Sequence, residues 1–124
     1  MVSPMPDRSP LIALGALNGA IAVAAGAFGA HALRERLEPR MLEVFETGAR
    51  YQMYHALAII LCGVMATRSA TTAGWIMQAG IVVFSGSLYA LSLSGVKVLG
   101  AITPLGGLAF LAGWGLLAWG AWRG

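Results

Sequence analysis

Three long stretches of this sequence contain no Asp, Glu, Lys or Arg: residues 9–33, 69–96 and 98–122. At about 1.5 Å of rise per helical residue, each is long enough to cross a hydrocarbon core of roughly 30 Å. A fourth apolar run, residues 51–67, is barely long enough. Hydrophobic residues make up 58% of the 124 and charged residues only 10%, which indicates that the solvent of this chain is lipid.

Inside lipid the backbone must satisfy its own hydrogen bonds, and the sequence shows no strand pattern, so the spans are expected to be helices. We predict one all-α domain over residues 1–124, an integral membrane four-helix bundle. The predicted spans are about residues 10–33, 51–67, 73–94 and 104–122. Thr103–Pro104 is typical of a helix start. Between the first two spans we expect an amphipathic helix at about residues 39–50, lying in the membrane interface and bending at Gly48 into the second span.

Small residues recur at helical spacing and predict the faces on which the helices pack. In the first span they are spaced alternately four and three residues apart, and in the last two spans they recur every seven residues. Such faces let neighbouring helices approach closely in lipid. The predicted packing glycines are Gly15, Gly19, Gly26, Gly29, Gly80, Gly106 and Gly113. Asn18 lies beside the first of these faces, and we expect it to hydrogen-bond to a neighbouring helix.

Several classes of function lack support in the residues. The formal charge of +3 comes from scattered basic residues, without the basic run of a nucleic-acid surface. The single cysteine, Cys62, excludes an intramolecular disulfide. No histidine or cysteine motif supports a metal or haem site, and no nucleophile motif supports an enzyme. We therefore expect a non-enzymatic protein without a cofactor.

One polar cluster is the candidate site. His31 ends the first span and His55 opens the second, so both are expected at the same membrane boundary. Glu46 and Arg50 are spaced to pair. Polar groups at this depth are costly unless they are paired, which makes the cluster a functional candidate. The candidate ligand-binding residues are His31, Glu46, Arg50, Tyr51, Gln52, Tyr54 and His55. They form either a structural hydrogen-bond network or a site for a lipid headgroup, a quinone or a proton.

Three blocks of sequence resemble a known family. They are GAFGAHAL at Gly26–Leu33, FETGARYQMYHALA at Phe45–Ala58 and TPLGGLAFLAGW at Thr103–Trp114. Together they resemble the bacterial family called domain of unknown function 423, whose animal relatives are named transmembrane protein 256. The resemblance covers essentially the whole chain and implies a small four-span membrane protein without an established activity. Glu38 departs from the smaller capping residue expected before Pro39.

Two roles remain open at this point. In the first, the protein is a structural or accessory subunit that binds copies of itself or a larger membrane complex. In the second, the polar cluster binds a small molecule. In both, the expected location is the cell (inner) membrane, crossed several times, with the lipid bilayer as surroundings and no nucleic-acid partner. Five basic residues on the loop side against three on the terminal side place both termini outside the cytoplasm.

Overall fold

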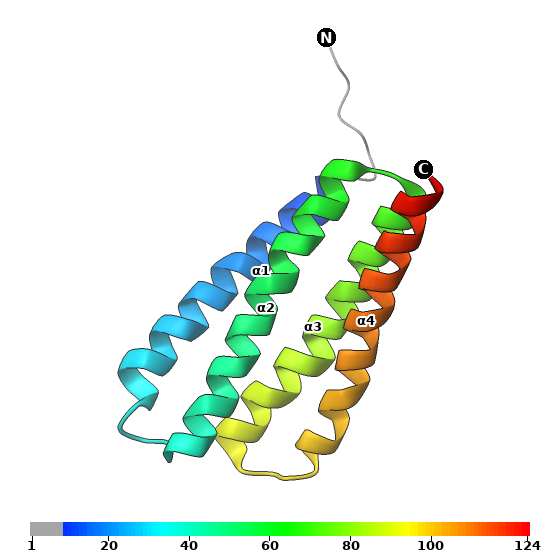
Figure 1. Ribbon diagram of the computed structural model, residues 1–124. Coiled ribbons are helices and arrows are strands. Elements are labelled where there is room, and N and C mark those ends of the chain that lie inside the picture. The colour runs from blue at the N-terminus through cyan, green and yellow to red at the C-terminus, as the bar shows by residue number, and fades with distance from the viewer. Residues whose placement is uncertain (1–8) are drawn as a thin grey trace.

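The computed structural model describes residues 9–124 as four antiparallel helices, with no strand in this part of the chain. The elements are α1 (Ser9–Phe28), a π-helical turn η1 (Gly29–Leu33) that continues it, α2 (Pro39–Met65), α3 (Arg68–Ser94) and α4 (Leu99–Arg123). The α1–α2 and α3–α4 loops lie at one end, and the α2–α3 turn lies with the C-terminus at the other (Figure 1). The predicted all-α class is confirmed.

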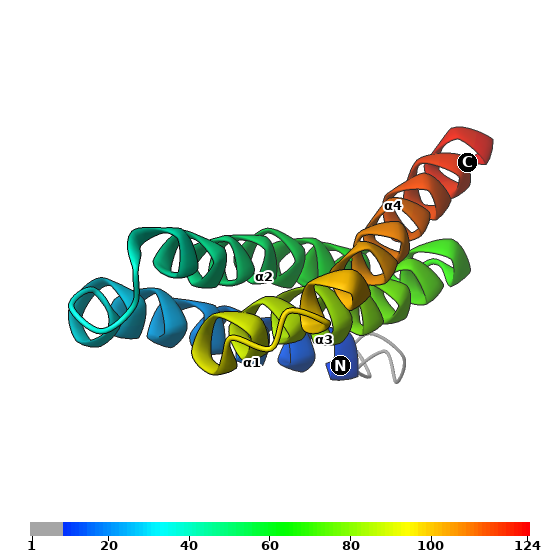
Figure 2. The same cartoon turned by 90° about the horizontal axis from the view of Figure 1, so that it is seen from below.

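The helices form an open bundle in which each helix packs on its neighbour in the sequence. α2 contacts both α1 and α3, and α4 packs chiefly on α3. Seen from below, α1 and α3 lie on the same side of α2, and α4 diverges from the other helices toward its C-terminal end (Figure 2). α1 and α4 are therefore the outer helices, and α2 and α3 form the centre.

Three of the four helices are long and apolar enough to cross a membrane: α1 with η1, α3 and α4. α2 differs because its first half carries Arg40, Glu43, Glu46 and Arg50. Only its second half continues the apolar pattern of its neighbours. The fourth crossing that the sequence predicted therefore depends on the part of α2 that follows Arg50.

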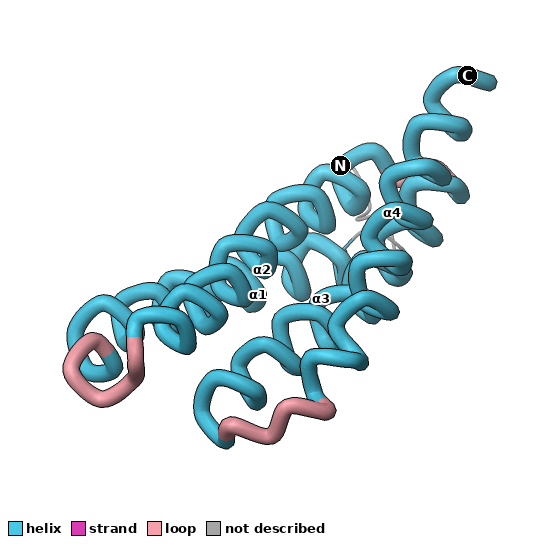
Figure 3. Tube along the Cα trace, turned by 60° about the horizontal axis from the view of Figure 1, so that its bottom comes forward, coloured by secondary structure: helices cyan, strands magenta, loops and turns pink. Residues whose placement is uncertain are grey.

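The predicted interfacial helix and second span are one continuous helix, so the bend expected at Gly48 is wrong (Figure 3). Gly48 is buried where a side chain would meet Tyr89 and Leu88 of α3. The Ser85 hydroxyl also donates a hydrogen bond to the Gly48 carbonyl at 2.7 Å. These contacts hold the charged half of α2 against the bundle, which an amphipathic pattern alone does not reveal.

Two helices begin earlier than the sequence predicted. α3 begins at Arg68 because the Thr67 hydroxyl caps it, accepting a hydrogen bond from the Ala70 amide at 3.0 Å. α4 begins at Leu99, and Pro104 lies inside it. Short-range bonds lead into this helix, such as that from the Leu99 amide to the Val96 carbonyl at 3.1 Å. Pro104 has no amide hydrogen to donate to the Gly100 carbonyl, so the helix lacks one backbone bond in its second turn.

The core mixes small and large side chains, and the small residues allow close contacts between helices. The buried apolar cluster comprises Leu11, Ala58, Ile59, Cys62, Ala70, Ala73, Met77, Ile81 and Phe110, drawn from all four helices. A methyl group added at Gly15 would lie 2.5 Å from Ile60 and 2.8 Å from the Ala56 carbonyl oxygen. Helices pack in lipid through such backbone-to-backbone approaches.

The predicted packing glycines divide into two groups. A methyl group added at any of five would meet a neighbouring helix at 3.2 Å or less; these are Gly15, Gly29, Gly80, Gly106 and Gly113. Gly19 and Gly26 have nothing within 4 Å of that position, so the packing role predicted for them is wrong. Gly26 lines an open groove between α1 and α2, so a methyl group there would have space.

This division gives a matched pair of substitutions. We expect Gly15→Ala to lower the free energy of unfolding by about 1–3 kcal/mol, because the new methyl group overlaps the backbone of α2. Gly19→Ala should leave stability unchanged or raise it by about 0.5–1 kcal/mol, because alanine favours a helix and has space here. Unfolding in mixed micelles measures both. Equal effects of the two substitutions would contradict the close α1–α2 contact at Gly15.

Candidate functional site

His55 lies in the cleft between α2 and α4 and uses both ring nitrogens. The Trp114 indole N–H donates to His55 Nε2 at 3.0 Å, and His55 Nδ1 lies 2.8 Å from the Tyr51 carbonyl oxygen. Because an indole nitrogen can only donate, Nε2 must accept, and the proton of the neutral ring is on Nδ1. His55 is therefore held as one neutral tautomer, with neither nitrogen free for a metal or a ligand.

Aromatic rings surround this histidine. The imidazole stacks on Phe110 with a centroid distance of 3.5 Å and an interplanar angle of 7°. Tyr51 packs on Phe84 at 4.9 Å and on Tyr54 at 5.5 Å. Tyr51 and Tyr54 are partly exposed at the outer edge of this group, and His55 is 4% exposed. The cluster fixes α4 against α2 through side chains.

His31 does not join this cluster, so the predicted His31/His55 site is wrong. His31 is exposed on the π-helical turn η1. Its neighbour Gly29 packs on Phe45, which precedes His55 by ten residues, or about 15 Å along α2. The two histidines also lie on different sides of α2, because α1 packs on one side and α4 on another. The sequence placed both at one boundary because it treated residues 39–50 as a surface helix.

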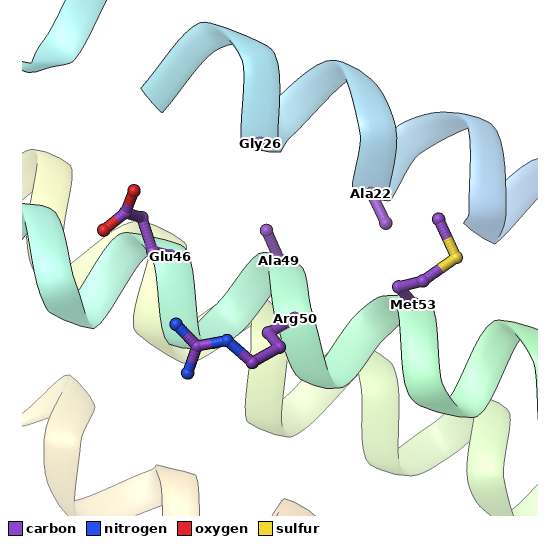
Figure 4. Close-up of a pocket in the computed structure, with 6 residues that line it drawn as sticks. All are labelled: Ala22, Gly26, Glu46, Ala49, Arg50 and Met53. Carbon is purple, nitrogen blue, oxygen red and sulfur yellow. The ribbon is translucent and has the colours of Figure 1, made fainter. Parts of the chain in front are cut away.

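Glu46 and Arg50 line an open groove of about 330 Å³ between α1 and α2, together with Ala22, Gly26, Ala49 and Met53 (Figure 4). Their charged groups point in different directions rather than toward each other (Figure 4). The pairing expected from their spacing is therefore not formed. Both side chains remain available to groups outside the monomer.

Gln52, the remaining candidate, belongs to a different and more deeply buried network. Its Nε2 donates to Asn18 Oδ1 at 3.0 Å, and its Oε1 accepts from the Tyr89 hydroxyl at 2.7 Å. Asn18 Nδ2 donates to the Leu14 carbonyl at 3.0 Å and to Gln78 Oε1 at 2.6 Å. This amide network, Asn18, Gln52, Gln78 and Tyr89, joins α1, α2 and α3.

The Leu14 carbonyl fixes the direction of every hydrogen bond in the amide network. A carbonyl oxygen only accepts, so the Asn18 atom beside it must be the amide nitrogen. Asn18 Oδ1 must then accept from Gln52, and Gln52 Oε1 must accept from Tyr89. At the other end, Gln78 contributes its oxygen to Asn18, which leaves the Gln78 amide nitrogen as a donor without a partner in the network.

The sequence indicated Asn18 and Gln52 separately but not that they bond to each other. Gln78, Tyr89 and Trp114 were not among the predicted site residues. A signal for Gln78 was present in the sequence: Asn and Gln are rare inside apolar spans, and each needs a polar partner there. Among residues 9–124, no group of three His, Cys, Asp or Glu side chains is placed to hold a metal ion.

The fold and its long apolar helices define an all-α membrane protein. The chain belongs to the family described as "Protein of unknown function (DUF423)", whose model matches residues 25–107. It is 52% identical over 108 residues to "UPF0382 membrane protein YwdK" of Bacillus subtilis (strain 168), covering 83% of this chain and 88% of that relative. It is 50% identical over 109 residues to "UPF0382 membrane protein SAB0533" of Staphylococcus aureus (strain bovine RF122 / ET3-1), covering 86% and 89%. No solved structure matches the chain.

Proposed function

We propose that this protein is a self-associating, non-enzymatic membrane protein, in which two copies pack through the outward face of α2. The observation that carries the proposal is the charge on this face. Arg40, Glu43 and Arg50 are exposed, and Glu46 is half-buried between them. We call these four residues the α2 charged face.

The α2 charged face lies beside apolar segments of the neighbouring helices. Phe45 of α2 packs on Gly29 of η1, and Gly48 packs on Leu88 and Tyr89 of α3. The apolar ends of α1 and α3 therefore run beside the charged half of α2. Charged side chains at membrane depth cost roughly 2.5–3.5 kcal/mol each near the centre unless they find partners. A protein surface that covers this face would remove that cost.

The order of the charges favours a second copy as the partner. Along α2 the signs run positive, negative, negative and positive, so the face is neutral as a whole. When two α2 helices pack in parallel about a two-fold axis, each arginine lies about one turn from a glutamate of the partner. Arg50 then pairs with Glu46 of the other copy, and Arg40 with Glu43. Beyond these pairs, toward the C-terminal end of α2, the same face continues with exposed Leu57 and Leu61. These leucines can pack against their counterparts in the second copy.

A charge-swap experiment tests this pairing. Glu46→Arg and Arg50→Glu, each alone, place like charges together and should weaken self-association by about tenfold. The double variant restores opposite charges and should recover association. Glu35→Arg, an exposed site in the loop before α2, is the matched control. Energy transfer between labelled copies in liposomes measures the dimer fraction.

The wild-type protein remaining monomeric at every protein-to-lipid ratio would contradict the proposal. If a different protein copurifies with the wild type and is lost in both single variants, the α2 charged face binds a larger complex instead. The protein would then be an accessory subunit.

We further propose that the protein crosses the bacterial cell (inner) membrane four times, with its loop end in the cytoplasm. Arg34, Arg36, Arg40, Arg50 and Lys97 lie toward the loop end, and Arg68 and Arg123 toward the other end. Arg8, which also counted toward the terminal side, lies outside the described residues. Basic residues favour the cytoplasmic side.

Reporter fusions test this orientation. A reporter after Gly124 should score as outside the cytoplasm, and one inserted in the loop at residues 34–38 should score as inside. The reverse pattern would overturn the orientation, and the same side for both reporters would contradict four crossings.

A further inference from the structure

A groove between α1 and α3, on the side away from α2, opens where the amide network ends. The part farther from the loop end has a volume of about 340 Å³, and its lining includes Asn18, Gln52, Gln78, Ser85 and Tyr89. α1 and α3 lie on the same side of α2 (Figure 2) and barely contact each other. α2 closes its base, because Gln52 reaches the groove from that helix.

Two of the amide groups that line this groove have unused hydrogen-bonding capacity. Both hydrogens of the Gln78 amide nitrogen and one hydrogen of the Gln52 nitrogen have no partner within the network. The Asn18 nitrogen has used both of its hydrogens, on Leu14 and Gln78. The Tyr89 and Ser85 hydroxyls donate elsewhere, to Gln52 and to the Gly48 carbonyl. A ligand that supplies an acceptor oxygen would satisfy the free amide donors.

No charged residue lines the groove, which favours an uncharged ligand. Gln78 lies ten residues from the start of α3, or about 15 Å from that end. In a hydrocarbon core of roughly 30 Å, this is close to the middle of the bilayer. Unsatisfied amide groups are most costly at this depth, and a charged headgroup cannot reach it cheaply.

The groove continues toward the loop end as an apolar channel. This second part, about 420 Å³, shares Ile21 and Tyr89 with the first. Its other lining residues, which include Phe28, Phe45 and Leu93, are all apolar. The polar end is therefore deep in the membrane, and the apolar end runs toward the surface. A phospholipid has the opposite polarity, because its headgroup and ester groups remain at the surface.

We propose that this groove binds an uncharged, lipid-soluble carbonyl compound of the quinone type. Its carbonyl oxygen accepts hydrogen bonds from the amide groups of Gln78 and Gln52. Its alkyl or isoprenoid tail lies in the apolar part of the groove, against Phe28 and Leu93. The site is separate from the α2 charged face, so it goes beyond the proposed self-association and does not depend on it.

The test uses a decyl-substituted benzoquinone as the probe, titrated into the full-length protein in nanodiscs. We expect saturable binding of one quinone per chain and a lower carbonyl stretching frequency in the infrared spectrum of the bound probe. Gln78→Leu should weaken binding by about tenfold. Val82→Trp, at an exposed position in the groove wall, should block binding without removing any bond of the network.

Ser87→Ala is the matched control. It removes a side-chain hydrogen bond to Thr103 at the α3–α4 contact and should leave quinone binding unchanged. Decylbenzene, which has the tail without the carbonyl, should not compete. Absence of saturable binding would overturn the proposal, as would unchanged binding in both Gln78→Leu and Val82→Trp. Equal competition by decylbenzene, or one-to-one displacement by phosphatidylglycerol, would also overturn it.

Discussion

The hydrogen bond between Gln52 and Asn18 joins α2 to α1. Because Gln52 also accepts a hydrogen bond from Tyr89, the same side chain links this pair of helices to α3. In lipid, water does not compete for such a bond, and each amide must find its partner within the protein. The Leu14 carbonyl orients Asn18, and the orientation passes through Gln52 to Tyr89. One backbone carbonyl thus fixes the orientation of the amides that join three helices, and it leaves the Gln78 amide nitrogen without a partner in the network.

The same principle explains why the histidine that looked most reactive is structural. His55 has an indole donor on one nitrogen and a backbone carbonyl on the other, and its ring stacks on Phe110. The polar groups that keep unused capacity are elsewhere: the Gln78 amide in the α1–α3 groove and the charges along α2. The two proposals therefore assign different surfaces to different partners, a small uncharged molecule and a second copy of the chain.

The sequence predicted the helical class and the first span well, because long uncharged runs have one stable form in lipid. It misplaced residues 39–50 because an amphipathic pattern is shared by a surface helix and by a buried helix with one polar face. Position 48 holds a glycine because Tyr89 packs against it and leaves no space for a side chain, not because the chain bends there. Gly19 fits the same spacing as Gly15, and only the position of α2 distinguishes them. The partners of Gln52 and His55 lie 34 and 59 residues away, so they depend on helix rotation and register, which the spacing does not determine.

The central claim is that the amide network, rather than apolar packing alone, holds α1 against α2. A double-mutant cycle on Asn18→Leu and Gln52→Leu measures it through the free energy of unfolding in mixed micelles. The account predicts a coupling energy of about 0.6–1.7 kcal/mol, between the average and the maximum measured for hydrogen bonds between membrane helices. A second cycle on Asn18→Leu and Thr103→Val, which pairs the network with a distant α4 contact, should be additive. Additivity within about 0.3–0.5 kcal/mol for Asn18 and Gln52 as well would contradict the account.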